Sequence, residues 1–317
     1  MARLKEAAQE QRIKTLEAEL KAERKTSEKL SSQLEIARGA RKWKVPAPAK
    51  PKKLKGDTVR VVFGDTHGSS IDKKAAAALL ADLKSLDPTE IIIGGDVIDC
   101  GGFLAQHQTM GYVAETEYTY EEDVIAANRF LDLLPKHAGH AKIECIEGNH
   151  DQRVERWCVT QTLRNGKDAE FLRKCFAPEF LLHFKERGIP YYRRAEKYDG
   201  LNINGWIKRE KCFFTHAIST AKHAASQAVT KTGGNVVYFH THRPDFAQVN
   251  LVATGPVAAW CPGCISELRK YYQHSHPSDH AHGYGVQLIS RTGQFIHINV
   301  PIIEGRSLLM PMINRAT

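Results

Sequence analysis

Short apolar, β-branched runs alternate with helical patterns from about residue 58 onward, and this alternation constrains the fold more than any other feature. Val59–Phe63 precedes a helical pattern over about residues 71–86, and Ile91–Ile93 precedes another over about residues 120–134. Ile143–Ile146 follows as a third apolar run. Strand-length runs that alternate with helical periodicity predict a β-α-β-α-β unit, whose strands lie parallel.

The second half of the chain is richer in strands. One helix is expected around residues 218–230. The predicted strands are Leu201–Trp206, Cys212–Thr215, Val236–Phe239, Val249–Ala253, Val257–Trp260, Val286–Ser290 and Phe295–Val300. This density of strands favours an α/β or α+β layered sandwich with mixed sheets over an all-parallel Rossmann fold.

The excess positive charge belongs to the first 56 residues. The chain has 45 Lys and Arg against 36 Asp and Glu, which gives a net charge of +9. Residues 1–56 hold 16 basic and 7 acidic side chains, a difference of +9, and residues 57–317 hold 29 of each. We therefore expect a charged helix at 1–37, a basic linker with prolines at 38–56, and one folded domain at 57–317.

The N-terminal segment has a heptad pattern. Its apolar a and d positions are Ile13, Leu16, Leu20, Leu30, Leu34 and Ala37, and Glu23 and Ser27 interrupt the series. The g and e positions pair Arg12 with Glu17 and Glu19 with Arg24, which suits a parallel partner helix. Two interpretations remain, a solvated single helix and a weak coiled coil that makes a homo-oligomer. The second is slightly favoured because an isolated helix with few apolar contacts is marginal in water.

The linker also has two interpretations. Residues 38–55 contain eight basic side chains, no acidic ones, and three prolines. Such a segment cannot bury a core, and a solvated tether is the favoured interpretation. The alternative is an arm that binds nucleic acid through up to eight phosphate contacts, with affinity that falls steeply as salt rises.

Neither a membrane span nor a disulfide framework is expected. No stretch approaches the ~18 consecutive apolar residues of a membrane helix, and the start of the chain has no apolar signal core. Both features favour a cytoplasmic protein. The seven cysteines are an odd number in a long chain, so we expect most to be reduced. Cys261 and Cys264 form the only close pair, for which a structural turn is favoured over a metal or redox role.

Polar residues follow each of the first three strands. These are Asp65 and His67 after the first strand, Asp96 and Asp99 after the second, and Asn149 and His150 after the third. Ligands of open α/β sheets bind outside the carboxyl ends of the strands, so these loops should share one edge. The 31 residues from Asp65 to Asp96 suit one βαβ crossover, which places the two carboxylates side by side.

Three histidines follow strands in the second half, namely His216, His240 and His242. With the polar residues of the first three loops they form a mixed nitrogen and oxygen donor set, of the kind that holds manganese, iron, nickel, cobalt or zinc. Seven donors are too many for one ion. They suit two ions if one carboxylate bridges, and ion pairs about 3.5–4 Å apart recur in phosphoryl-ester displacement.

The ordered series resembles the calcineurin-like metallophosphoesterase superfamily over about residues 57–245, with a domain that extends to about residue 300. The resemblance implies a four-layer α/β/β/α sandwich with two mixed sheets and two divalent transition metals, with manganese favoured. It implies that Asp65, His67 and His242 bind the first metal, that Asn149, His216 and His240 bind the second, and that Asp96 bridges. His150 corresponds to the general acid and phosphate-binding histidine, and Asp99 to the carboxylate that orients it.

These residue types suit phosphoester hydrolysis. Two dications would lower the pKa of a bridging water, so that hydroxide attacks the phosphate in line near neutral pH. The leaving alkoxide needs a proton, which a histidine beside an aspartate can deliver. Arg153 is a candidate bidentate phosphate clamp, although a surface salt bridge is the favoured interpretation for such an arginine.

Two departures from the superfamily pattern refine the prediction. Phe239 stands where Gly usually precedes the final H-x-H motif. The protein Ser/Thr phosphatases of the superfamily carry Arg-Gly after the second aspartate and Glu after Asn-His, whereas this chain has Cys100-Gly101 and Asp151. The pattern looks closer to bacterial and phage phosphodiesterases and repair-type exonucleases.

The sequence thus predicts a metal-dependent phosphodiesterase that acts on nucleotides or nucleic acid. The alternatives are a phosphomonoesterase for small molecules or phosphoproteins, and a non-catalytic binding module on the same fold. The intact motif residues argue against the binding module. The loop with His274, His276, His280 and His282 is predicted to be a plain polar loop, rather than a third metal site or part of the substrate cleft.

Overall fold

The computed structural model describes residues 11–25, 27, 43–47, 57–100, 119–165, 168–268 and 278–309. The chain divides into two compact units, Met1–Trp43 and Lys44–Thr317. In the first unit residues 11–25 are α-helical, within the segment predicted to be helical. The predicted boundary between residues 37 and 38 lies outside the described ranges, and the one between 56 and 57 lies at the edge of one, so both stay predictions. Among the described residues, no helix is long and apolar enough to cross a membrane.

Seven strands of the second unit form one mixed sheet, in the order β12-β11-β10-β1-β2-β3-β4. The bounds of its parallel strands are β1 Thr58–Phe63, β2 Glu90–Ile93, β3 Lys142–Ile146 and β4 Tyr191–Tyr192. The antiparallel strands are β10 Gly283–Ile289, β11 Phe295–Ile303 and β12 Arg306–Ser307. The predicted β-α-β-α-β unit is therefore confirmed, with β1, β2 and β3 adjacent and parallel.

Five strands form the second mixed sheet, in the order β5-β6-β7-β9-β8. Their bounds are β5 Trp206–Arg209, β6 Cys212–Thr215, β7 Asn235–Tyr238, β8 Asp245–Leu251 and β9 Gly255–Cys261. Strands β6, β7 and β9 run parallel, and β5 and β8 run antiparallel to their neighbours.

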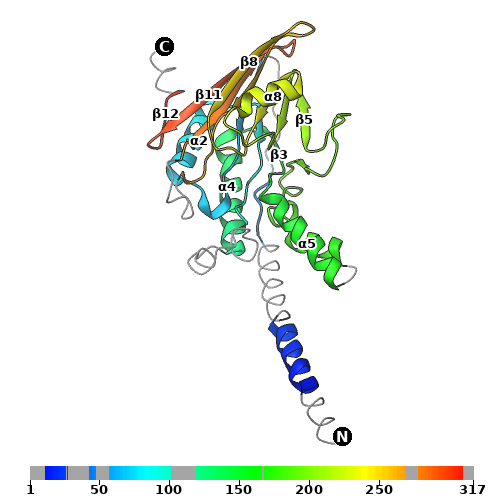
Figure 1. The fold of residues 1–317 in the computed structure, drawn as a ribbon. Helices are drawn as coiled ribbons and strands as arrows, with labels where there is room; N and C mark the ends of the chain where they lie inside the picture. Colours follow the sequence, from blue (N-terminus) through cyan, green and yellow to red (C-terminus); the bar gives the residue numbers. More distant parts are fainter. Residues whose placement is uncertain are drawn as a thin grey trace, which may run out of the picture. The chain divides into compact units, whose positions relative to one another are not determined.

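Helices cover the outer faces of the two sheets (Figure 1). The helical bounds are η1 Gly68–Ser70, α2 Lys73–Leu86, α4 Tyr120–Ala138, α5 Asp151–Asn165, α6 Ala169–Phe176, α7 Pro178–Leu181 and α8 Ala224–Thr232. Helix α2 packs against α4 and β12 on the larger sheet, and α8 packs on β7, β8 and β9 of the smaller one. Asp72 caps α2 by accepting hydrogen bonds from the main-chain N–H groups of Lys74 and Ala75.

The core between the sheets is apolar. It contains Val62, Ile92, Ile146, Phe214, Val237 and Phe239, each at most 1% exposed. Burial of this surface from both sides explains why the strands read as continuous β-branched and aromatic runs. The predicted four-layer α/β/β/α sandwich is confirmed.

Several elements of the second unit differ from the predicted ones. The helix expected around residues 218–230 begins only at Ala224, as α8, and the strand expected over Val249–Ala253 spans Asp245–Leu251, as β8. The strand expected over Leu201–Trp206 begins only at Trp206, because Gly205 has a φ of +74° and closes a turn. Helices α5 and α6 follow β3 without having been predicted. Helix α5 carries many polar side chains, and its buried apolar positions are few, chiefly Val154 and Cys158, so its sequence gives a weak helical signal.

Candidate metal centre

The predicted site residues lie at the carboxyl ends of β1, β2, β3, β6 and β7, where the two sheets meet. Five of them have left-handed backbone angles: Asp65 (φ 52°), His67 (φ 54°), Asp96 (φ 49°), His240 (φ 84°) and His242 (φ 55°). This conformation costs a non-glycine residue on the order of 1–3 kcal/mol and persists only where the surroundings enforce it. The backbone at these five residues is therefore strained, and this conformation turns their side chains toward one another.

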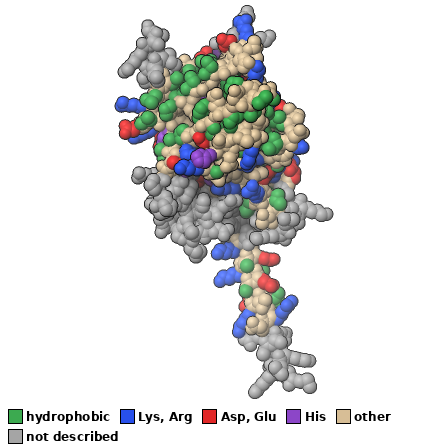
Figure 2. Space-filling view, turned by 45° about the horizontal axis from the view of Figure 1, so that its top comes forward, with side chains coloured by type: hydrophobic (Ala, Val, Ile, Leu, Met, Phe, Trp, Pro, Cys, Tyr) green, Lys and Arg blue, Asp and Glu red, His purple; other side chains and the backbone are tan. Residues whose placement is uncertain are grey.

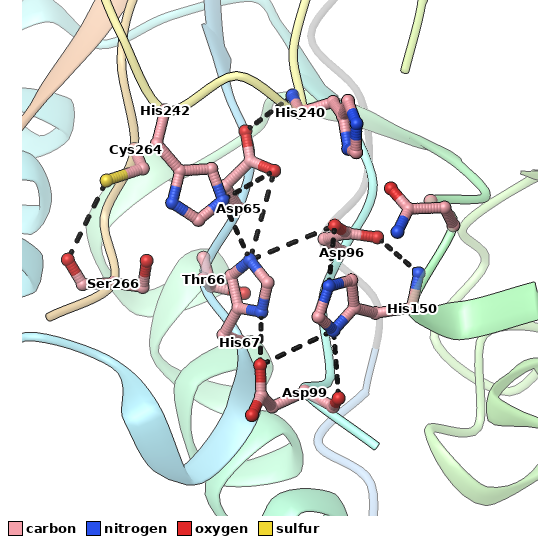
Figure 3. Close-up of polar contacts among 12 residues, drawn as sticks. Asp65, Thr66, His67, Asp96, Asp99, His150, His240, His242, Cys264 and Ser266 are labelled. Atoms are coloured by element: carbon pink, nitrogen blue, oxygen red, sulfur yellow. Dashed lines mark hydrogen bonds and ion pairs between the residues drawn. The ribbon is translucent and has the colours of Figure 1, made fainter. Parts of the chain in front are cut away.

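The first cluster consists of Asp65, His67 and His242 (Figure 3). The two histidine Nε2 atoms lie 3.0 Å apart, and His242 Nε2 lies 3.4 Å from Asp65 Oδ1. His67 Nδ1 lies 2.6 Å from Asp99 Oδ1, so it carries the ring proton and leaves a lone pair on Nε2. Two nitrogens and a carboxylate oxygen therefore converge on one point, as in a metal site.

The second cluster consists of Asp96, His216 and His240, with Asn149 beside it. His216 Nδ1 donates to the Gly94 carbonyl at 2.7 Å, which directs the lone pair of Nε2 into the site. This Nε2 atom lies 2.9 Å from Asn149 Oδ1 and 3.1 Å from Asp96 Oδ2. The amide oxygen, the carboxylate and the imidazole are a donor set for a divalent transition ion.

Asp96 lies between the two clusters. Its Oδ1 accepts a hydrogen bond from the His150 main-chain N–H at 2.8 Å. Its Oδ2 lies 3.1 Å from His216 Nε2 of the second cluster and 3.8 Å from His67 Nε2 of the first. A carboxylate in this position can serve both clusters.

Two buried carboxylate oxygens without hydrogen-bond partners indicate whether these residues fit a pair of metal ions. Asp65 Oδ1 and Asp96 Oδ2 are buried and make no hydrogen bond, yet both face histidine nitrogens. A buried carboxylate oxygen without a partner is costly, and a bound cation removes that cost. The residues present therefore fit two divalent ions, one at each cluster.

The electrostatics of the centre favour cations. Burial raises the pKa of Asp96, but the nearby His216 and His150 outweigh this effect and hold it well below its usual value. Burial likewise opposes a charge on His242, yet Asp65 raises the pKa of this histidine to about 10. Burial, reinforced by His216, lowers the pKa of His240 to about 4. A metal ion would compete with protons for the nitrogen and oxygen atoms of these side chains.

His150, the predicted general acid, lies at the rim with its side chain 13% exposed. Its Nδ1 lies 2.9 Å from the main-chain oxygen of Asp99 and 3.4 Å from the Asp99 Oδ1 atom. The Asp99 carboxylate contacts His67 more closely than His150. Asp99 therefore contacts both histidines. Its carboxylate lies mainly against His67, and its main-chain carbonyl contacts His150.

Arg153 makes no surface salt bridge among the described residues. Its Nη2 lies 3.0 Å from His150 Nε2, and its Nη1 donates to the Asp99 carbonyl at 3.2 Å. Helix α5 puts Arg153 three residues after His150, one turn along the same face. The guanidinium therefore lies at the histidine nitrogen that would exchange a proton with a substrate.

Asp151 organises the site, and the sequence did not indicate this role. Its buried carboxylate accepts hydrogen bonds from the N–H groups of Val97 (3.1 Å), Ile98 (3.2 Å) and Gly148 (2.9 Å). It thereby ties the loop after β2 to the loop after β3. Burial and the nearby Asp96 raise the pKa of Asp151 to about 6. Its position directly after Asn149-His150 is the only sequence signal that could have singled it out.

Phe239, which stands where the superfamily pattern has glycine, packs beneath the site. Its ring is fully buried and lies over the glycines that end β1 and β2. A Cβ atom on Gly94 would lie 2.2 Å from this ring, and one on Gly64 would lie 2.8 Å from it. The two glycines leave the space that the phenylalanine fills, directly before His240 in the chain.

The histidine-rich loop borders the first cluster in part. The ring of His280 lies 4.8 Å from that of His242, and His282 Nε2 lies 2.9 Å from the Ser266 carbonyl. His274 and His276 lie outside the described residues. Cys261 and Cys264 are free and buried. Cys264 Sγ donates to the Ser266 carbonyl at 3.7 Å (Figure 3), a contact that suits a structural turn.

Two mixed sheets that hold Asp, Asn and His side chains at the ends of their strands define a metal-dependent hydrolase of the α/β/β/α sandwich class. The family model for calcineurin-like phosphoesterases matches residues 60–285, and the chain belongs to this family. The family typically binds two divalent metals. The chain is therefore a metal-dependent phosphoesterase by family and by the donor set of its site.

Two solved structures are similar over most of their length. Vacuolar Protein Sorting 29 from Cryptosporidium parvum is 10% identical, with 80% of this chain and 95% of that one covered and a TM-score of 0.41. Yfce, a phosphoesterase from E. coli, is 16% identical, with 76% and 98% covered and a TM-score of 0.33. At these scores neither carries an argument about function. A comparison with curated proteins found no match.

Proposed function

We propose that this phosphoesterase hydrolyses phosphodiesters of nucleotides or nucleic acid. The proposed ligands are Asp65, His67 and His242 for one ion and Asn149, His216 and His240 for the other, with Asp96 shared. The observation that carries this proposal is the convergence of two donor clusters on the orphaned oxygens of Asp65 and Asp96. Two bound divalent ions would supply an activated water and neutralise charge on the phosphoryl oxygens.

His150 is the proposed proton donor to the leaving oxygen. Its Nε2 lies 3.9 Å from Asp96 Oδ2, at the rim of the centre. The Asp99 carbonyl accepts from Nδ1 and fixes the ring so that Nε2 faces the centre. A leaving alkoxide takes a proton from such a group in the transition state, and this assistance is worth about 10²–10⁴ in rate.

The contact between Arg153 and His150 must change in this mechanism. A guanidinium donates only, so His150 Nε2 acts as an acceptor while Arg153 contacts it. An arriving phosphate offers the guanidinium a better, charged acceptor. We therefore assign Arg153 to the phosphate, which releases Nε2 to carry the proton.

The presence of Cys100 in place of an arginine favours a phosphodiester substrate over a phosphomonoester. It stands where the phosphatases of the superfamily have arginine, and it is fully buried, with its Sγ donating to the His150 carbonyl at 2.8 Å. A phosphomonoester dianion carries one more negative charge than a diester. With a thiol in place of an arginine at this position, the site has one cation fewer for that charge.

One assay panel tests this proposal. The manganese-loaded protein is given an aryl phosphodiester, an aryl phosphomonoester, cyclic nucleotides, and single- and double-stranded DNA, and metal content is measured in parallel. We expect about two ions per chain and a higher kcat/KM for at least one diester than for the monoester. A preference for the monoester would establish a phosphomonoesterase. Two bound ions with no hydrolysis of any ester would indicate a binding module.

Manganese is the proposed metal. The donors combine imidazole nitrogens with carboxylate and amide oxygens and include no thiolate, and such sets suit manganese as well as the later ions. Activity after reloading the chelated protein with Mn²⁺, Zn²⁺, Ni²⁺, Co²⁺ or Fe²⁺ tests this choice. A higher kcat/KM with another ion at equal occupancy would replace manganese.

A cytoplasmic location is also proposed. Its support is that the chain has an odd number of cysteines, seven, and that all of them are buried, as is usual for reduced cysteines in a chain of this length. Fractionation of the native host with an antibody to the chain tests it.

Two partner interactions are proposed for the N-terminal segment. Helix 11–25 exposes Ile13, Leu16 and Leu20 by 51%, 49% and 50%, and hydrophobic patches alternate with charged ones along it (Figure 2). We propose a parallel helix of a second copy as the partner. Sedimentation equilibrium tests it, with a Leu16→Glu, Leu20→Glu variant expected to be monomeric and an unchanged dimer contradicting it.

The second interaction is nucleic-acid binding by the basic linker 38–55, most of which lies outside the described residues. Its support is the charge of the segment, eight basic side chains without an acidic one. We expect deletion of residues 1–56 to weaken DNA affinity and flatten its salt dependence. Unchanged affinity and slope would show that the segment is only a tether.

A further inference from the structure

Two consecutive arginines follow β4, and their side chains have different surroundings. Arg193 pairs with Glu155, and with Glu196 at 2.8 Å. Arg194 makes no ion pair with any described residue, and its Nη1 atom is buried without a hydrogen bond. An arginine stays charged at every physiological pH, so it cannot relieve this situation by losing a proton.

The backbone of Arg194 is anchored next to the metal centre. Strand β4 pairs in parallel with β3, so both strands end at the same edge of the sheet. The Arg194 N–H donates to Glu147 Oε2 at 2.8 Å, and Glu147 immediately precedes the Gly148-Asn149-His150 segment. On the other side Gly205 packs so closely that a Cβ atom there would lie 3.1 Å from the Arg194 Cα.

The Asp96 carboxylate of the centre acts on the charge of Arg194. Burial lowers the pKa of this guanidinium, and the carboxylate that offsets the lowering most is Asp96, ahead of Glu147. Asp96 is the carboxylate shared by the two clusters. With two cations bound in the site, Arg194 would add a further positive charge beside them, and a bound anion would offset that charge.

A phosphoryl group supplies such an anion. Its non-bridging oxygens gain hydrogen-bonding strength as charge develops during in-line displacement, and a donor in a water-poor site stabilises that charge more than one in solution. The Nη1 atom of Arg194 has no acceptor in the structure, so a bound phosphoryl oxygen would supply the hydrogen bond that this donor lacks.

We propose that Arg194 binds a non-bridging oxygen of the phosphoryl group being hydrolysed. This inference rests on the proposed function in that the substrate is a phosphate ester. It assigns Arg194 and Arg153 to the same phosphate, with Arg153 on the His150 side and Arg194 on the side of β4. Arg193 has no part in the site, although it is the adjacent residue.

The test compares Arg194→Ala, Arg194→Lys and the control Arg193→Ala in the manganese-loaded full chain with an aryl phosphodiester. We expect Arg194→Ala to lower kcat/KM about 10²-fold, as for the loss of one oxyanion donor. Arg194→Lys should recover only part, because an ammonium cannot reproduce the planar pair of donors. Arg193→Ala should stay within about twofold of the wild type.

Three further readouts separate binding from a structural role. The inhibition constant of inorganic phosphate should rise at least about tenfold in Arg194→Ala, since one charge-assisted contact contributes on the order of 1.4 kcal/mol or more. Added guanidinium chloride should restore part of the activity of this variant. Bound metal should stay at the wild-type stoichiometry. Unchanged kcat/KM and phosphate inhibition, or a loss equal to that of Arg193→Ala, would overturn the proposal.

Phosphate binding also separates this inference from the proposed function. If the wild type hydrolyses no ester, the proposed function fails, and calorimetric titration of the metal-loaded protein with inorganic phosphate still decides the role of Arg194. Weaker phosphate binding by Arg194→Ala than by Arg193→Ala would support the inference. Equal binding by the two variants, or none by the wild type, would refute it.

Discussion

The Asp99 carboxylate lies 2.6 Å from His67 Nδ1 and 3.4 Å from His150 Nδ1, so one side chain contacts both a proposed metal ligand and the proposed general acid. Its closer contact is with the ligand. A carboxylate that accepts the distal N–H of a metal-binding histidine fixes the tautomer and raises the basicity of the ring. The same oxygen thus couples the metal centre to the proton donor.

Asp99→Asn should therefore weaken metal binding as well as catalysis. Loss of such a hydrogen bond typically lowers metal affinity by about 10–100-fold, and the amide cannot stabilise a charged ring. Competition with a fluorescent chelator measures the affinity, and the aryl diester assay measures kcat. If Asp99 served His150 alone, kcat would fall while the metal affinity of the variant matched that of the wild type.

His150→Ala should affect substrates according to their leaving groups. An alkoxide leaving group needs the proton, so its hydrolysis should slow by about 10²–10⁴, whereas an acidic phenol leaves without one and its hydrolysis should slow far less. The exposed His140→Ala variant serves as the control. An equal loss with both leaving groups would assign His150 to phosphate binding only.

Local features of the sequence predicted most of the fold and brought the proposed metal donors to one edge of the sheets. Strands β1, β2 and β3 have continuous apolar runs, and each polar loop follows its strand directly, so periodicity placed Asp65, Asp96 and Asn149 at one edge. Arg194 and Asp151 act through partners that are distant in the sequence. Asp151 bonds to Val97, 54 residues away, and no spacing rule predicts that contact. The contact of Arg153 with His150 depends on helix α5, which was not predicted because its sequence is mostly polar.

Asp151→Asn should destabilise the domain although it changes only one atom. The carboxylate accepts three main-chain N–H groups, and an amide would place a donor against one of them, the N–H of Gly148 or those of Val97 and Ile98. We expect a loss of about 2–3 kcal/mol in the free energy of unfolding, measured by urea titration at pH 7.5. The exposed Asp57→Asn should be neutral within about 0.5 kcal/mol. Equal stability of the two variants would contradict the bridging role.

Gly94→Ala should reveal the packing that accommodates Phe239. The added methyl group would lie 2.2 Å from the Phe239 ring, so either the ring or the backbone at the end of β2 must move. Overpacking of this kind typically costs about 1–3 kcal/mol. In a Phe239→Ala background the same change should cost much less, and a double-mutant cycle from urea unfolding measures the difference. Additive effects would show that the two positions are independent.

His297 should make the domain less stable in acid. Burial lowers the pKa of this histidine to about 4, and its Nε2 keeps a hydrogen bond of 2.9 Å with Asn299 Oδ1. In the unfolded chain the pKa is near 6.5, so between about pH 6.5 and pH 4 the unfolded state binds the extra proton. The contribution of His297 to the free energy of unfolding is fully present above pH 6.5 and is lost as the pH falls toward 4. A pKa difference of about 2.5 corresponds to about 3 kcal/mol.

His297→Gln keeps a donor for Asn299 and cannot take up a proton, so it should remove this contribution. We expect the wild type to lose about 3 kcal/mol more than this variant between pH 7 and pH 4, measured by urea unfolding in the presence of chelator. The exposed His140→Gln variant should follow the wild type. Parallel pH profiles for the wild type and His297→Gln would show that His297 takes up its proton in the folded state as readily as in the unfolded chain.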